Sequence, residues 1–438
     1  MFGNRGHPPC LVYSGSAEGE DTNHYMEKLI SLCSILSERY VPPAVWGKSG
    51  HIQTAIYSIK QSRPGLDLGE QKRVRKYVTL EDGSRVSYDL FPPASVSHSA
   101  SDDITLVVCP GLANSSENLY IKAFAFQATS LGYRVAVLNL LGVLDQPLTT
   151  PRIFNLGSTE EYSAMVRSVT QKHPNSKLIA VGFSLGANIV CKYFGENPSN
   201  QRDFICAVSL CQGYDFNRMR EKMKTWSKLR KFYAMQLSKK VKSVILSNWD
   251  YIKTALIVSD GQITAPSQDD LHEKVKNSNL MPVVDELVTI KLTGHESVDE
   301  YYRWASSKHY LGNMELPTLF VNALDDPLFC RELYKHPINK AKSHRQSLTV
   351  LTKHGGHLGF FTKTGNSFVD SSTWIERMVL QYVAAMAQIH KHITSIPATV
   401  SVIESDFNSY TKTHNGRERP AEYPVIQRYT GRPLQTDV

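Results

Sequence analysis

The spacing of apolar and polar residues changes along the chain, and each spacing predicts one kind of element. Residues 73–80 and 85–91 alternate between apolar and polar and predict a β-hairpin. Helical spacing predicts helices that separate several short apolar runs. Parallel strands need such crossover connections, so we expect an α/β fold with a mostly parallel sheet and helices on both faces. Buried strands are predicted where the apolar runs begin, at residues 103, 134, 178, 204, 317 and 347.

Residues 214–313 interrupt this alternation of strands and helices. The segment is charged, rich in aromatic residues and mostly helical in pattern, so we predict a helical lid inserted into the core. The polar chain ends lack any periodicity, which predicts disorder at the N-terminus. The predicted divisions are a disordered N-terminus (1–22), an N-terminal helix and connecting segment (23–72), a first core part (73–213), the lid (214–313), a second core part (314–394) and a polar tail (395–438).

Composition adds limits on the class of protein. Apolar residues make up 41% of the chain and charged residues 21%, which is typical of a globular protein with a large core. The formal net charge of +8 is too low in density for a nucleic-acid binder. The seven cysteines form no Cys-x-x-Cys pair, so we expect reduced core thiols and no metal site. No apolar run reaches the roughly 18 residues of a transmembrane helix, and no signal peptide is expected.

A strand pattern, a glycine-rich turn and a helix pattern meet at Gly182-Phe183-Ser184-Leu185-Gly186. This Gly-x-Ser-x-Gly arrangement predicts a nucleophile elbow, in which a sharp turn exposes the serine hydroxyl. Gly182 and Gly186 lack a Cβ atom and so permit close approach of the strand and the helix. Ser184 is therefore the candidate nucleophile, the alternative being a glycine-rich turn with a surface serine.

A serine nucleophile needs an imidazole base that is oriented by a carboxylate. The chain order serine, acid, histidine is expected in this type of fold. Asp326 follows a predicted strand and precedes a proline, and we favour it as the acid, with Asp325 as the alternative. His357 follows two glycines after the last strand, and we favour it over His354 as the base.

Attack on a carbonyl group creates an oxyanion that needs preorganised donors. The backbone N–H of Leu185 directly follows the nucleophile and begins a helix. The loop after the strand that ends at residue 109 should supply the second donor, and Leu112 is the candidate. We therefore predict an oxyanion hole formed by the N–H groups of Leu112 and Leu185.

Residues 178–193, 321–327 and 353–361 resemble the AB hydrolase-4 group of α/β-hydrolases. Two further runs, at 40–54 and 211–214, are similar to lipase members of that group. The resemblance implies an α/β-hydrolase fold and hydrolysis of monoacylglycerols, including 2-arachidonoylglycerol, and of simple acetyl esters, without a cofactor. It also implies a triad of Ser184, Asp326 and His357, stimulation by a steroid, and association with the plasma membrane or endoplasmic reticulum.

An apolar stripe runs through the first part of the predicted lid, among ten Lys or Arg residues between 218 and 242. A basic helix with such a stripe suits an anionic lipid surface. The alternative is a lid whose stripe covers the active site. The stripe consists of Phe216, Met219, Met223, Trp226, Tyr233, Leu237 and Val241.

The C-terminal residues Thr436-Asp437-Val438 fit a weak PDZ-type ligand.

The sequence as a whole predicts a serine ester hydrolase that acts on lipid monoesters. An acyltransferase or thioesterase with the same triad is one alternative. A non-catalytic receptor for a lipid or a steroid on a hydrolase scaffold is the other, although such a binder has no need of all three catalytic groups. No metal and no nucleic-acid partner are expected.

Overall fold

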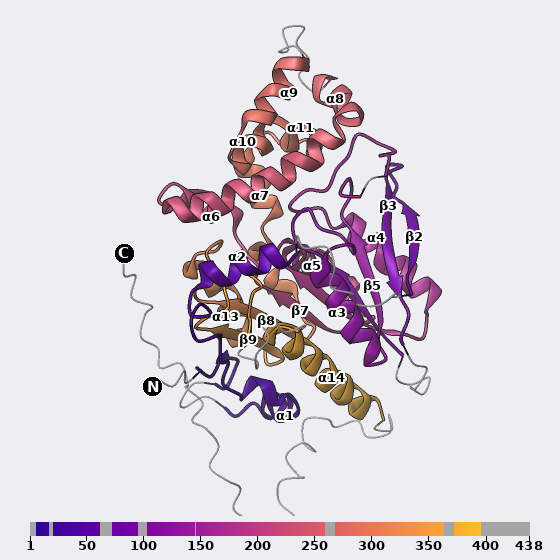
Figure 1. The fold of residues 1–438 in the computed structure, drawn as a ribbon. Coiled ribbons are helices and arrows are strands. Elements are labelled where there is room, and N and C mark those ends of the chain that lie inside the picture. The colour runs from indigo at the N-terminus through magenta and orange to yellow at the C-terminus, as the bar shows by residue number, and fades with distance from the viewer. Residues whose placement is uncertain are drawn as a thin grey trace, which may run out of the picture.

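A central β-sheet organises the computed structural model, which describes residues 6–16, 21–61, 72–94, 103–144, 146–258, 268–362 and 372–395. Within these residues the sheet has nine strands in the order β1-β9-β8-β7-β6-β4-β5-β3-β2 (Figure 1). The strands from β4 to β9 run parallel, whereas β1, β2 and β3 are antiparallel to their neighbours. The mostly parallel sheet predicted from the sequence is confirmed.

The parallel strands are short apolar runs, which is why they are buried on both faces. Every residue of β4, β7, β8 and β9 is buried. The strands are β1 (Cys10–Val12), β2 (Val74–Thr79), β3 (Arg85–Phe91), β4 (Ile104–Cys109), β5 (Arg134–Asn139), β6 (Lys177–Phe183), β7 (Phe204–Leu210), β8 (Thr318–Ala323) and β9 (Ser347–Thr352).

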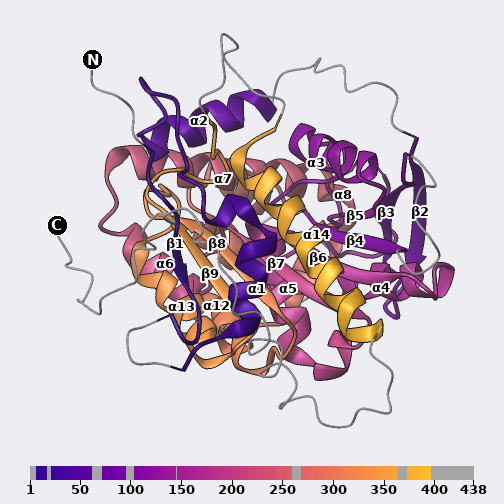
Figure 2. The same cartoon turned by 90° about the horizontal axis from the view of Figure 1, so that it is seen from below.

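Helices cover both faces of the sheet. Seen from below, α1 (His24–Leu32) and α14 (Trp374–Ser395) lie in front of the strands (Figure 2), and α3 (Leu119–Ser130) contributes to the same core. Their buried residues form one apolar core with alternate strand residues. The opposite core contains residues of α4 (Glu160–Lys172) and α5 (Leu185–Glu196). The expected layers of helix, sheet and helix are therefore present.

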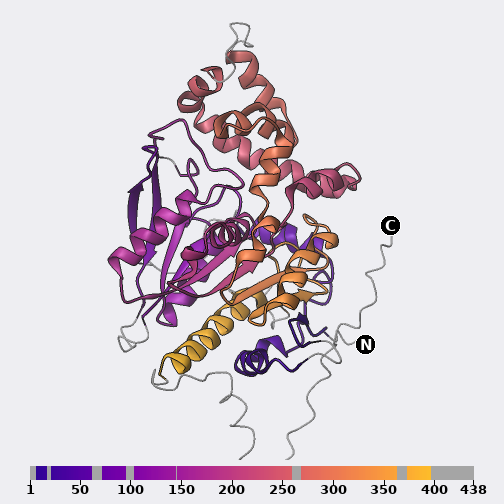
Figure 3. The ribbon, with the colours of Figure 1, turned by 180° about the vertical axis from the view of Figure 1, so that it is seen from behind.

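The segment between β7 and β8 is helical and projects beyond the ends of the strands (Figure 3). Its α-helices are α6 (Phe216–Met223), α7 (Lys228–Ser247), α8 (Trp249–Val258), α9 (Gln268–Asn277), α10 (Met281–Val284), α11 (Ile290–Thr293) and α12 (Val298–Ala305), with a π-helical turn at Asp285–Thr289. We refer to residues 214–313 as the lid. The other helices among the described residues are α2 (Gly50–Gln61), α13 (Lys335–Ser343) and short 3₁₀ turns at Ser34–Leu36, Pro198–Gln201, Ser307–His309, Leu311–Asn313 and Arg331–Tyr334.

The N-terminal segment differs from the expectation. Disorder was predicted over residues 1–22, but Cys10–Val12 forms β1, which pairs antiparallel with β9. Leu11 and Val12 are buried there. The strand was missed because an apolar run of only a few residues is too short to show a periodicity in the sequence. Most of the predicted tail, including Thr436-Asp437-Val438, lies outside the described residues. Of the helices described, none combines the length and the apolar character needed to span a bilayer.

Candidate active site

Ser184 lies in a strained turn between β6 and α5. Its φ of +52° and ψ of −112° are unusual for a residue with a side chain. A Cβ atom on Gly182 would lie 2.4 Å from Ala187 Cα, and one on Gly186 would lie 2.1 Å from the Cys109 carbonyl oxygen. Only glycine fits at these two positions, so the two glycines permit the sharp strand-to-helix turn at Ser184.

The structure brings Ser184, His357 and Asp326 into one line. The Ser184 Oγ atom lies 2.9 Å from His357 Nε2, and His357 Nδ1 lies 2.8 Å from Asp326 Oδ2. Asp326 is 1% exposed and also accepts a hydrogen bond from the Leu328 N–H, at 2.7 Å. An imidazole that carries its proton on Nδ1 donates to Asp326 and accepts from the serine hydroxyl.

The two alternatives weighed from the sequence form a second pair beside the first. His354 Nδ1 lies 3.4 Å from Asp325 Oδ2, and the Gly356 N–H donates to Asp325 Oδ1 at 2.9 Å. Burial raises the pKa of Asp325 above its ordinary value. Hydrogen bonds thus connect Asp326 and His357 to Ser184. Asp325 instead accepts a hydrogen bond from the backbone of the loop that carries His357, and His354 lies beside Asp325.

The two residues chosen as oxyanion donors lie in the wall of the pocket that contains Ser184. Leu185 is the first residue of α5, where a backbone N–H has no partner within the helix. Leu112 belongs to the loop after β4, in which the Gly111 N–H donates to the Tyr120 hydroxyl at 2.9 Å and Ala113 has a φ of +53°. The left-handed turn at Ala113 fixes the course of this loop next to the serine.

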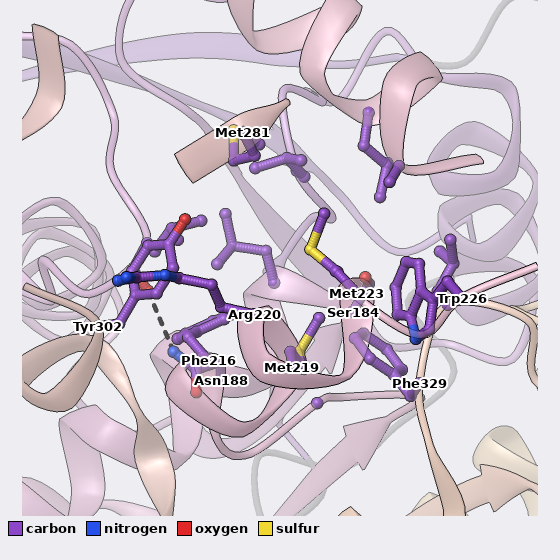
Figure 4. A pocket seen from close by; sticks show the side chains of 17 residues that line it. Ser184, Asn188, Phe216, Met219, Arg220, Met223, Trp226, Met281, Tyr302 and Phe329 are labelled. Atoms are coloured by element: carbon purple, nitrogen blue, oxygen red, sulfur yellow. Dashed lines mark hydrogen bonds between the residues drawn. The ribbon is translucent and has the colours of Figure 1, made fainter. Parts of the chain in front are cut away.

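A mostly apolar pocket of about 110 Å³ opens at Ser184. Most of its lid residues come from α6 and α7, and their side chains converge on one hollow (Figure 4). Five residues of the apolar stripe therefore face the pocket, and a sixth, Val241, is buried. This orientation favours the lid interpretation of the stripe over contact with a lipid surface. The stripe residues in the pocket wall are Phe216, Met219, Met223, Trp226 and Leu237.

Three polar side chains of the pocket wall, Asn188, Tyr302 and Arg220, interact with other protein groups. Asn188 donates to the carbonyl groups of Leu156 and Ala305, at 3.0 and 2.8 Å. The Tyr302 hydroxyl donates to Asp285 at 2.6 Å, and Arg220 lies 3.1 Å from Asp299. Sequence reasoning missed Asn188, although its position four residues after Ser184 places it on the same face of the elbow helix. The tyrosine carried no comparable signal in the sequence.

Acidic and thiol side chains are the groups that could bind a metal ion or take part in redox chemistry. Within the described ranges, no cluster of three or more His, Cys, Asp or Glu side chains could hold a metal ion. The seven cysteines are all free, and five of them are buried. Burial raises the pKa of thiols such as those of Cys206 and Cys211, which makes them less reactive as nucleophiles.

Comparison with known proteins gives the family and several curated relatives. A model of the α/β hydrolase fold family matches residues 104–364. A zebrafish (Danio rerio) protein named monoacylglycerol lipase ABHD2 is 40% identical over 391 residues, covering 87% of this chain and 88% of that protein. A Drosophila melanogaster protein named abhydrolase domain-containing protein 2 is 38% identical, covering 84% and 89%. Human phospholipase ABHD3 is 26% identical, covering 82% of each chain.

Proposed function

The chain belongs to the α/β-hydrolase fold family and is a serine ester hydrolase, and from this premise we propose that it hydrolyses monoacylglycerols and simple acyl esters. One observation carries the proposal. The hydrogen-bonded line of Ser184, His357 and Asp326 ends at the mostly apolar pocket, where an acyl chain can be bound next to the nucleophile. The printed name of the zebrafish relative supports the same substrate class.

The proposed reaction has two halves. In the first, His357 takes the proton of the Ser184 hydroxyl while Oγ attacks the acyl carbonyl carbon, and Asp326 stabilises the imidazolium that forms. The backbone N–H groups of Leu112 and Leu185 stabilise the oxyanion. The carbon–oxygen bond to glycerol then breaks, and His357 gives its proton to the glycerol oxygen. In the second half, water attacks the acyl-serine in the same way and releases the fatty acid.

Labelling with a fluorophosphonate probe tests the nucleophile. We expect the parent protein to be labelled and to hydrolyse 2-arachidonoylglycerol, and Ser184→Ala to do neither. Ser130→Ala, at an exposed serine that ends α3, is the matched control and should behave as the parent does. A folded parent protein that is neither labelled nor active would refute the proposal and favour a receptor on a hydrolase scaffold.

The same assay separates hydrolysis from acyl transfer. A hydrolase gives free fatty acid as its main product even when an alcohol or a thiol is added. Transfer of the acyl group to the added alcohol or thiol as the main product would favour the acyltransferase alternative. Faster release of fatty acid from an acyl thioester than from the matching monoacylglycerol would favour the thioesterase alternative. Hydrolysis and acyl transfer both pass through the same acyl-serine, so the products rather than the geometry of the site distinguish them.

We also propose that an anionic lipid bilayer binds the outer face of α7. Leu229 and Phe232 are each 48% exposed there, next to the exposed Lys228 and Lys231. Apolar side chains between lysines suit an anionic membrane surface. In a flotation assay, Lys228→Glu/Lys231→Glu should lose binding to vesicles that contain phosphatidylserine. Binding equal to that of the parent would refute the proposed surface, and vesicles of phosphatidylcholine serve as the control.

Three expectations from the sequence stay predictions. The resemblance implies an activating steroid, which would raise the rate of monoacylglycerol hydrolysis when added to the purified protein. It also implies residence at the plasma membrane or endoplasmic reticulum, which fractionation of cells would test. A PDZ domain would bind the C-terminus, and a pull-down that is unchanged by deletion of Val438 would exclude it.

A further inference from the structure

The segment from Tyr40 to Thr54 packs against the loop that carries His357. The proposed reaction assigns this segment no role. It contains the run Trp46-Gly47-Lys48-Ser49-Gly50 and the first turn of α2. In the sequence it precedes His357 by about three hundred residues. We call residues 40–54 the brace and residues 353–361 the histidine loop.

Thr54 makes the most direct contact between the brace and the catalytic histidine. Its side chain is buried, and its Oγ1 atom accepts a hydrogen bond from the backbone N–H of His357 at 2.8 Å. The same hydroxyl donates to the Gly50 carbonyl at 2.7 Å. The threonine hydroxyl therefore has a fixed orientation, and its lone pair is presented to the histidine backbone.

Gln53 and Tyr40 hold the far end of the histidine loop. The Phe361 N–H donates to Gln53 Oε1 at 3.0 Å, and the Tyr40 hydroxyl donates to the Phe361 carbonyl at 2.8 Å. Gln53 is fully buried and donates through Nε2 to the Gly47 carbonyl at 2.6 Å. These bonds fix both backbone groups of Phe361, four residues beyond His357.

Glycines allow the brace and the two catalytic loops to approach each other closely. A Cβ atom on Gly356 would lie 2.4 Å from the Gly50 carbonyl oxygen and 2.7 Å from Thr54 Oγ1. A Cβ atom on Gly50 would lie 1.9 Å from the Asp325 carbonyl oxygen. The start of α2 thus packs against the backbone of Asp325 on one side and against the histidine loop on the other.

We propose that Thr54 is a positioning residue that holds the backbone of His357, so that the imidazole keeps its place between Asp326 and Ser184. The proposal rests on the proposed esterase function. The imidazole must lie within hydrogen-bond distance of both partners, and a shift of about 1 Å can lower a rate on the order of a hundredfold. Without an acceptor, the buried N–H of His357 would also lose its partner, which favours displacement of the loop.

The brace contacts the lid as well as the histidine loop. The Tyr233 hydroxyl of α7 donates to the His51 carbonyl at 2.8 Å, and the rings of these two residues stack with centroids 5.6 Å apart. His51 is separated from Thr54 by only two residues of the first turn of α2. The same short helix therefore connects a lid helix with the loop that positions the catalytic base.

Three variants and one soluble substrate, 4-nitrophenyl acetate, test the assignment. Thr54→Val keeps the shape of the side chain but removes the hydroxyl, and we expect kcat to fall about 10- to 100-fold with KM unchanged within twofold. Thr54→Ser restores the hydroxyl and should recover kcat to within threefold of the parent. The matched control is Thr318→Val, which removes a buried hydroxyl at the start of β8, and it should keep the kcat of the parent.

The rate of labelling by a fluorophosphonate probe is the second readout and should follow kcat. A kcat for Thr54→Val within twofold of the parent would overturn the proposal, and so would a loss of kcat that Thr54→Ser does not recover. Should Thr54→Val not fold, Gln53→Met removes the acceptor of the Phe361 N–H and should give the same loss of kcat at constant KM. A parent protein that is neither labelled nor active would instead contradict the proposed function.

Discussion

Asp285 provides a test of the physical reasoning that does not depend on catalysis. It lies in the π-helical turn of the lid and is fully buried. The hydroxyl groups of Tyr302 and Thr289 donate to its two carboxyl oxygens, at 2.6 and 2.7 Å. Burial raises the pKa of Asp285 from 3.8 to about 6, because the two hydrogen bonds only partly compensate the carboxylate for its lost hydration. We therefore consider the substitution Asp285→Asn.

The sign and size of the effect follow from proton linkage. The folded chain binds the Asp285 proton more tightly than the unfolded chain, so this contribution to stability is fully present below pH 3.8. It is lost as the pH rises through about 6. With about 1.4 kcal/mol for each pKa unit, the charged carboxylate lowers the free energy of unfolding by about 3 kcal/mol at pH 8. Asparagine carries no charge and removes this penalty.

Thermal unfolding at pH 5 and pH 8 measures the effect. We expect the Tm of Asp285→Asn to exceed that of the parent by a few degrees at pH 8, and the difference to shrink at pH 5. Asp250→Asn is the control, because Asp250 is exposed and its pKa is lowered by Lys253 rather than raised. A variant less stable than the parent at pH 8, or a difference in Tm that is equal at both pH values, would refute the reasoning.

Three further predictions concern the site and its support. Asp326→Asn should lower kcat about 10⁴-fold, whereas Asp325→Asn should lower it far less, and comparable losses measured with 4-nitrophenyl acetate would reject the assignment of the acid. Met219→Trp should fill the pocket and lower kcat/KM for long-chain monoacylglycerols relative to acetyl esters, and an unchanged ratio would place the acyl chain elsewhere. Gly50→Ala should lower the Tm, because a Cβ atom 1.9 Å from the Asp325 carbonyl oxygen must displace backbone, whereas the open position of Gly312 should accept alanine without loss.

The parts of the fold that rest on local pattern could be predicted from the sequence. The run before Gly182 is apolar, so β6 is recognisable, and the two glycines mark the turn at Ser184. The chain order of serine, acid and histidine then selects residues that come from the ends of β8 and β9. The carboxyl ends of parallel strands lie on the same side of the sheet, which is why residues so distant in sequence meet.

The parts that depend on tertiary contacts could not be predicted. The spacing of Phe216, Met219 and Trp226 shows that they share a face of the lid, but it does not show whether that face meets the core or a membrane. Only the packing of the lid on the sheet turns these side chains toward Ser184. Likewise, no local sequence pattern indicates that Thr54 lies next to His357, because the two residues are 303 positions apart in the chain.

The pairing of β1 with β9 has a consequence for the way the chain is made. Cys10 lies opposite Leu351, so β1 is synthesised long before its partner β9 and stays unpaired until residues 347–352 have been translated. Until then, or in a version shortened past Val12, β9 would present an open row of backbone N–H and C=O groups at the sheet edge, which invites association with other chains. Expression should therefore be sensitive to cuts and fusions near β1, far in sequence from the residues proposed for catalysis.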